Sequence, residues 1–133
     1  MTAIRYVNFL WISVLAVTIA ACVLDPFKTA ETPAQRGYAL EASYNIVLED
    51  ALEIASAPTT TAQVRDAIKA AEARSTPVID SLSDALADYE IERAKFEAGQ
   101  SNAERLTIVS GNLAGWVESA KQTLISFQAA FRN

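Results

Sequence analysis

The chain has no histidine and a single cysteine among its 133 residues, and each scarcity narrows what the protein can do. Without histidine it lacks the usual general base of enzymes and the commonest metal ligand. With one cysteine it cannot form an internal disulfide, so the fold depends on its hydrophobic core alone. Its four glycines form no phosphate-binding loop. We therefore expect no enzymatic activity, no cofactor and no metal site.

Positive charge is also scarce. Eleven basic residues face sixteen acidic ones, for a net charge of −5. Arg5 is the only charged residue before Asp25, so the chain beyond residue 21 keeps ten basic and sixteen acidic residues, a net charge of −6. An acidic domain without a basic patch is a poor candidate for binding nucleic acid or anionic lipid headgroups. We expect no nucleic-acid partner.

The first 25 residues are the most distinctive part of the sequence. Arg5 gives a basic start, Phe9 to Ile19 is an apolar centre, and small residues follow, which is the pattern of a secretory signal peptide. The block Ile19-Ala20-Ala21-Cys22 resembles the lipobox of bacterial lipoproteins. The resemblance implies that residues 1–21 are removed and that Cys22 carries the lipid. Residues 22–32 are then a tether.

An uncut membrane anchor is the alternative interpretation. The uncharged run from Tyr6 to Leu24 approaches the ~20 residues that a membrane-spanning helix needs. Pro26 disfavours helix in the residue before it and would end the span. On this interpretation Cys22 is an ordinary apolar side chain. In both cases Arg5 favours a cytoplasmic amino terminus, which places the rest of the chain in a periplasm.

Residues 33–133 are predicted to form a helical domain of three segments, at about 33–57, 62–98 and 103–131. Thr32-Pro33-Ala34-Gln35 and Thr60-Thr61-Ala62-Gln63 both have the pattern of a capping box at a helix start. Ser101 or Asn102 is the expected N-cap of the third helix. Pro58 ends the first helix, and Gly99 suits the C-terminal cap of the second.

Apolar residues recur at helical spacing in each segment. In the second segment the apolar stripe keeps its phase across Pro77, which predicts a continuous helix that is kinked there. Short connections favour antiparallel neighbours, so we expect an all-α antiparallel three-helix bundle behind the hydrophobic signal or anchor helix. The stripes are Leu40, Tyr44, Val47, Ala51 and Ile54; Val64, Ile68, Ala71, Ser75, Val78, Leu82, Ala85 and Tyr89; and Leu106, Val109, Leu113, Trp116, Ala120, Leu124, Phe127 and Phe131.

This geometry predicts which residues face one another. Around the first turn Glu53 should lie near Arg65, and Glu49 near Lys69. Around the second turn facing residue numbers should sum to about 200, which pairs Tyr89 with Gly111 and Ala85 with Gly115. The glycines are spaced Gly-x-x-x-Gly, and in a water-soluble segment this spacing is expected to allow close packing inside the bundle rather than association within a membrane.

Acidic residues form two groups that could suggest metal binding. Asp80, Asp84, Asp88 and Glu92 follow one helix face, but calcium sites usually take their ligands from an irregular loop, so a solvated face is expected. Glu49, Asp50 and Glu53 resemble the carboxylates of di-iron bundles only superficially, because those sites need Glu-x-x-His pairs. We expect these three to be surface charges paired with Arg65 and Lys69.

The aromatic residues near the chain end allow two interpretations. Trp116, Phe127 and Phe131 fall on the apolar stripe, so core packing is the default expectation. The alternative is that these aromatics are partly exposed and contact a partner protein. An exposed apolar patch around Phe127 and Phe131 would support the second interpretation.

The whole plan is similar to that of small helical lipoproteins encoded by phages and prophages of Gram-negative bacteria. The similarity rests on the lipobox, the Thr-Pro-Ala-Gln entry, the string Tyr38-Ala39-Leu40-Glu41-Ala42-Ser43-Tyr44 and the Ala-rich helix with its central proline. It implies no catalytic residues. In lipoprotein sorting, aspartate directly after the lipidated cysteine retains the protein in the inner membrane. Val23 occupies that place here, which favours the outer membrane.

The sequence therefore predicts a non-enzymatic, membrane-anchored periplasmic bundle that binds an unidentified protein partner or has a structural role. One alternative is an uncut membrane protein resembling the inner-membrane member of a phage spanin pair. That class favours long charged coiled coils, whereas the breaks at Pro58 and Gly99 predict a chain that folds back on itself. A small structural subunit of a membrane complex or virion is the other alternative.

Overall fold

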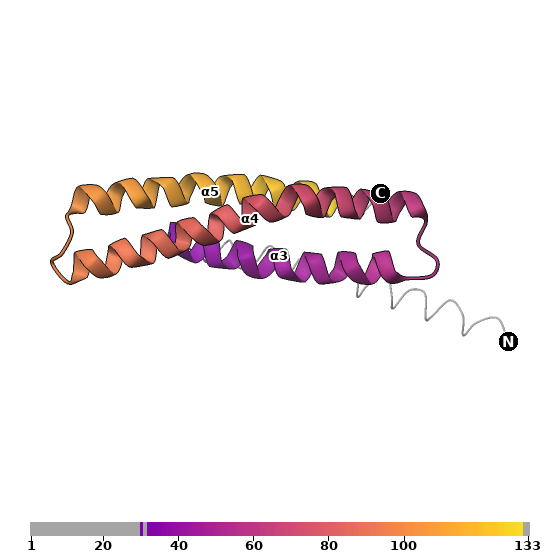
Figure 1. Ribbon diagram of the computed structural model, residues 1–133, viewed down its shortest axis with the longest axis horizontal. Helices are drawn as coiled ribbons and strands as arrows, with labels where there is room; N and C mark the ends of the chain where they lie inside the picture. Colours follow the sequence, from indigo (N-terminus) through magenta and orange to yellow (C-terminus); the bar gives the residue numbers. More distant parts are fainter. Residues whose placement is uncertain (1–29, 31, 132–133) are drawn as a thin grey trace.

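The part of the chain described by the computed structural model, residue 30 and residues 32–131, is helical and contains no strand. Its helices are α3 (Pro33–Ser56), α4 (Ala62–Glu97) and α5 (Ala103–Ala129) (Figure 1). The prediction of an all-α domain with three helices is confirmed there. The signal or anchor segment, Cys22 and most of the predicted tether lie outside the described residues. Within the described residues no helix is both long and apolar enough to cross a membrane.

The start of α3 has the predicted capping box. The backbone N–H of Gln35 donates to the Thr32 hydroxyl at 3.2 Å, and the backbone N–H of Thr32 donates to the Gln35 side chain at 3.1 Å. Pro33 occupies the first helical position, where its missing N–H costs nothing. These local bonds determine the start of the helix.

The second predicted capping box is wrong. Thr61 is the N-cap of α4, and its hydroxyl accepts from the Val64 N–H at 3.3 Å. The third helical position is therefore Val64, which has no polar group to bond back, instead of Gln63. The hydroxyl of Thr60 donates to the Ile54 carbonyl instead and ties the turn to the end of α3.

The α4–α5 turn has the two predicted caps. Gly99 has a φ of 70°, a left-handed conformation that favours glycine. Its N–H donates to the Phe96 carbonyl at 3.0 Å, and the Gln100 N–H donates to Lys95 at 2.8 Å, which is the Schellman arrangement. Asn102 then caps α5 by accepting from the Arg105 N–H at 2.9 Å.

Pro77 lies inside α4 and does not end it, so the predicted continuity is confirmed. Proline has no N–H to donate to the carbonyl four residues earlier. Ser75 before it and Ile79 after it are both buried, so the core face of α4 continues across Pro77. The Ser81 hydroxyl donates to the Pro77 carbonyl at 2.9 Å. The predicted kink stays a prediction.

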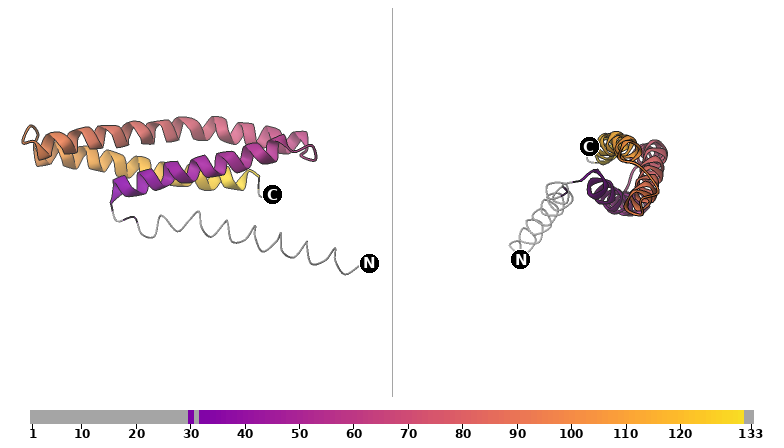
Figure 2. Two further views of the ribbon diagram at one scale, coloured as in Figure 1. Left: turned by 90° about the horizontal axis from the view of Figure 1, so that it is seen from below. Right: turned by 90° about the vertical axis from the view of Figure 1, so that its left-hand side faces the viewer.

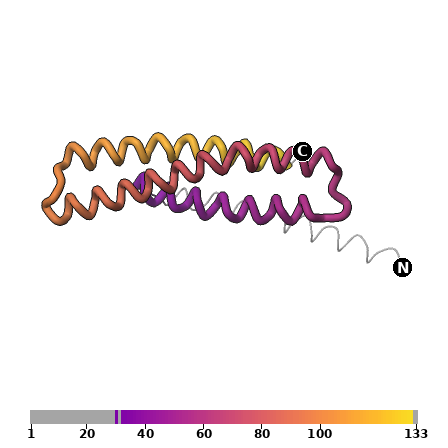
Figure 3. The backbone as a smooth tube through the Cα atoms, in the orientation of Figure 1, coloured from indigo at the N-terminus to yellow at the C-terminus, as the bar shows by residue number. Residues whose placement is uncertain are grey.

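The three helices run up, down and up (Figures 1 and 3). In the end-on view of Figure 2 they surround a common centre. The longest helix, α4, runs beside α5 from the α4–α5 turn and continues past the end of α5, whereas α3 starts well short of the α4–α5 turn. Tyr38, near the start of α3, already reaches Glu90 of α4, with the hydroxyl donating at 3.4 Å. The last part of α4 therefore packs against α5 alone.

The core is formed by one side of each helix. One ring contact ties α3 to the end of α5, since Tyr44 and Phe127 have centroids 5.7 Å apart. Phe131, just beyond α5, meets Phe127 edge-on at 5.8 Å. The Tyr44 hydroxyl is satisfied by a 3.1 Å hydrogen bond with Thr76. The buried apolar residues are Ala34, Leu40, Tyr44, Val47, Ala51, Ile68, Ala71, Ile79, Leu82, Leu86, Leu113, Val117, Ala120, Leu124 and Phe127.

The close helix approach occurs at Gly37, and the prediction that Gly111 and Gly115 provide it is wrong. A β-carbon at Gly37 would lie 2.9 Å from the Leu86 side chain, whereas at Gly111 or Gly115 it would meet nothing within 4 Å. The two glycines of α5 are exposed. The reason is the phase of α5, whose buried stripe passes from Leu113 to Val117 and leaves the glycines on the opposite side.

The predicted ion pairs across the first turn are also absent. Among the described residues no ion pair joins Glu53 to Arg65 or Glu49 to Lys69. Glu49 and Glu53 are exposed, which agrees with their predicted position on a wet face. Polar contacts between α3 and α4 form farther along, where the Ser83 hydroxyl donates to Glu41.

Candidate partner-binding furrow between α4 and α5

The predicted partner-contact aromatics lie in different environments. Phe127 is 1% exposed and belongs to the core, so it has no surface to offer a partner. Phe131 is partly buried against it. Trp116 is 39% exposed, because the buried stripe of α5 continues through the neighbouring Val117. Of these three aromatics, only Trp116 presents a large surface to solvent.

Trp116 lies in a shallow hollow between α4 and α5 with a volume of about 290 Å³. A second hollow of about 360 Å³ lies between the same helices. Its residues Arg74 and Thr123 are each seven positions, two helical turns, from Ser81 and Trp116 of the first. Both hollows are therefore on one side of the helix pair. The first is lined by Ser81, Asp84, Ala85, Asp88, Val109, Asn112 and Trp116; the second by Ala71, Arg74, Ser75, Gln122, Thr123, Ser126 and Phe127.

Helical spacing extends the first hollow toward the α4–α5 turn. Ile91 follows Asp88 by three residues, and Ile108 precedes Asn112 by four, so each lies on the face of its neighbour. Ile91 is 54% exposed and Ile108 is 57% exposed. We call the first hollow together with Ile91 and Ile108 the α4–α5 furrow. α3 does not cover it, because α3 makes its hydrogen bonds to α4 at Thr76, Ser83 and Glu90, on another side.

A row of carboxylates forms the α4 edge of the furrow. Asp80, Asp84 and Asp88 are exposed and stand one helical turn apart. Within residues 32–131 none of the three has an ion-pair partner, although Arg93 pairs with Glu90 at 2.9 Å and Lys121 with Glu118 at 3.8 Å. These three agree with the predicted solvated face. Their negative charge is therefore not neutralised by an ion pair within the described residues.

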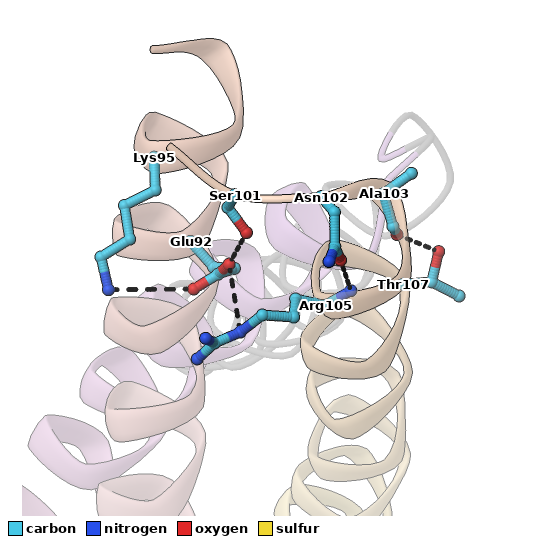
Figure 4. A network of polar contacts seen from close by, with 7 residues as sticks. All are labelled: Glu92, Lys95, Ser101, Asn102, Ala103, Arg105 and Thr107. Carbon is cyan, nitrogen blue, oxygen red and sulfur yellow. Dashed lines mark hydrogen bonds and ion pairs between the residues drawn. The ribbon is translucent and has the colours of Figure 1, made fainter. Parts of the chain in front are cut away.

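Glu92 was predicted as the fourth member of that row, and this is wrong. It is 4% exposed and faces the α4–α5 turn (Figure 4). The Ser101 hydroxyl donates to one carboxylate oxygen, which also lies 3.6 Å from Arg105 Nε. The other oxygen lies 3.9 Å from Lys95 Nζ. Glu92 is buried because it lies in the last part of α4, beyond the start of α3, where Ser101 and Arg105 cover its carboxylate.

The Glu92 cluster, consisting of Glu92, Lys95, Ser101 and Arg105, joins the two sides of the α4–α5 turn. Its carboxylate is satisfied by groups from both sides of the turn, which fixes α5 against α4. No set of three or more Cys, His, Asp or Glu side chains in the described residues is arranged to hold a metal ion. The arrangement around the furrow can bind by shape and charge, through an apolar floor with a negative edge.

Sequence reasoning missed the furrow and the buried Glu92, and one signal could have found both. The observed α4–α5 register pairs residues whose numbers sum to about 197, as with Glu92 and Arg105. Applied along the whole helix pair, this sum places Ser81 beside Trp116 and Arg74 beside Thr123, which aligns the two hollows. The predicted sum of about 200 was close, but it was applied to glycines on the wrong face of α5.

Comparison of the chain with protein-family models, with curated proteins and with solved structures gives no match.

Proposed function

We propose that this protein is a non-enzymatic binding module of the bacterial envelope, held at a membrane by its amino-terminal segment and presenting the helical bundle to a protein partner. The observation that supports binding is the α4–α5 furrow, where exposed apolar side chains lie beside unpaired carboxylates. The observation that supports anchoring is the lipobox-like Ile19-Ala20-Ala21-Cys22 at the end of an apolar run. The outer membrane is the proposed destination, since Val23 follows Cys22.

The anchoring part is tested at Cys22. The full-length gene is expressed in a Gram-negative host, and the membrane fraction is examined by mass spectrometry. The proposal expects a mature chain that begins at a diacylglyceryl-modified Cys22. The matched Cys22→Ser variant should keep its leader and change its fractionation. An intact Met1 peptide with an unmodified Cys22 would overturn lipidation and establish the uncut anchor of the alternative interpretation.

The folded-back bundle bears on the spanin-like alternative. The chain reverses direction at both turns, between α3 and α4 and between α4 and α5, so the described domain is much shorter than its helices placed end to end (Figure 1). A protein that bridges a periplasm through a long coiled coil needs the opposite geometry. The proposal therefore favours a module that presents a surface over one that spans a distance.

A further inference from the structure

We propose that the α4–α5 furrow binds an amphipathic helix whose apolar face is bordered by lysine or arginine, supplied by a partner protein. This inference rests on the proposed binding role and names the partner's chemistry.

The apolar floor of the furrow fits a helix. Ala85, Val109 and Trp116 form the apolar lining of the hollow, and Ile91 and Ile108 adjoin it about one turn along α4 and α5. Trp116, Ile91 and Ile108 are between 39% and 57% exposed. A groove between two packed helices accepts side chains spaced three and four residues apart on a third helix, which is the usual form of helix-in-groove recognition.

The charge around the floor selects a basic partner. Asp84 and Asp88 line the furrow and Asp80 continues their row, with no ion-pair partner for any of them in the described part of the chain. Lys95 and Arg105, the basic residues nearest the α4–α5 turn, form ion pairs with Glu92 instead. Lysine or arginine at the border of a docking helix would neutralise the aspartates and speed the encounter.

The same charge argument disfavours a second copy of this chain as the molecule that binds in the furrow. The chain has a net charge of −5, and a symmetric dimer across the furrow would bring two identical aspartate rows to one interface. Like charges placed together across an interface oppose association. Charge complementarity therefore favours a different protein with a basic helix.

The experiment uses the full chain in nonionic detergent with Trp11→Phe, so that Trp116 is the only tryptophan and reports on the furrow. The probe is a synthetic leucine–lysine amphipathic helix of about 18 residues, or five turns. A leucine–glutamate peptide of the same pattern is its control. We expect saturable binding, read from Trp116 emission, of the lysine peptide only. Raising the salt from about 50 to about 500 mM should weaken it.

Paired variants locate the binding. Asp84→Asn with Asp88→Asn should weaken the lysine peptide about tenfold, since charge pairs steer and hold such complexes. Glu49→Gln with Glu53→Gln removes the same charge at the same spacing from α3 and should leave affinity unchanged. Circular dichroism verifies that each variant is folded. Partition of peptide into micelles is common to all samples and cancels in the comparison.

Three results would overturn the inference. The first is equal binding by the α4 and α3 variants, and the second is equal binding of the glutamate peptide. The third is sedimentation of the chain as a dimer in which Trp116 is shielded from an aqueous quencher, which would make a second copy the occupant. None of these readouts depends on Cys22, so a failure here is distinguishable from a failure of the anchoring proposal.

Discussion

Replacing each of the three helical glycines by alanine should have opposite effects on stability at Gly37 and at the two glycines of α5. A glycine inside a helix costs roughly 0.5–1 kcal/mol relative to alanine. Gly111 and Gly115 are exposed, and an added β-carbon meets no atom within 4 Å. Alanine at either place should therefore raise the free energy of unfolding by about 0.5–1 kcal/mol.

At Gly37 the same propensity gain is opposed by overpacking. The added β-carbon would lie 2.9 Å from Leu86 Cδ2 and 3.2 Å from Leu86 Cδ1 and Cγ. Carbon atoms pack best at about 3.5–4.0 Å, so the whole isobutyl group must retreat. Leu86 is 2% exposed and has no room to move without displacing the core. Overpacking of this kind costs about 1–3 kcal/mol, so we expect a net loss of about 1 kcal/mol.

The assay is thermal and urea unfolding of the full chain, followed by circular dichroism under one detergent condition. A change of about 1 kcal/mol moves the Tm by about 4 °C or more in a domain of this size. Gly37→Ala should lower the Tm, while Gly111→Ala and Gly115→Ala should each raise it. A rise with Gly37→Ala matching that of Gly111→Ala would refute the close approach of α3 to α4. A fall with Gly111→Ala would restore its predicted packing role.

Other changes test the core, the turn and the α3–α4 contact. Phe127→Ala should cost about 3–5 kcal/mol in urea unfolding, because a buried ring leaves a cavity; a loss below about 1 kcal/mol would contradict its core position. Glu92→Gln should cost about 1–2 kcal/mol, and the cost should shrink in an Arg105→Gln background; an unchanged cost would mean that the two are uncoupled. Burial, then the charge and hydrogen bond of Glu90, raises the pKa of Tyr38 above its ordinary 10.0. The stability linked to Tyr38 is thus present below pH 10 and lost as pH rises through the folded pKa. Glu90→Gln should lower that pKa in an NMR titration of the tyrosine rings, and no shift would exclude the contact.

The helices were largely predictable because their ends are set by local chemistry. The Thr32–Gln35 box, Gly99 and Asn102 act within four residues of sequence, and each forms as expected. The capping box at Thr60 and Gln63 failed for an equally local reason. With two threonines in succession, the helix began one residue later and brought Val64 to the position that needed a glutamine.

Which side of α5 faces the core was less predictable, because two different sets of apolar residues on this helix have helical spacing. From Leu113 a step of three reaches Trp116 and a step of four reaches Val117, and both are apolar. Packing against the other two helices decides between them, and the pattern of α5 alone does not contain that information. The predicted stripe took the step of three, which placed Trp116 in the core, whereas Trp116 is 39% exposed and Val117 is buried. The candidate site was missed through this one choice.

The carboxylates of α4 show how helix length converts one sequence pattern into two environments. Asp80, Asp84, Asp88 and Glu92 share a four-residue spacing, which alone predicts one solvated face. The angle between residues four apart is about 40°, so the row turns around the helix as it advances. By Glu92 this rotation has carried the side chain to the α5 side, where Ser101 and Arg105 enclose it. The earlier three stay on the outer edge beside Trp116. Burial of the fourth carboxylate holds α4 and α5 together at the turn, and thus keeps the furrow that the other three border in a fixed shape for a partner.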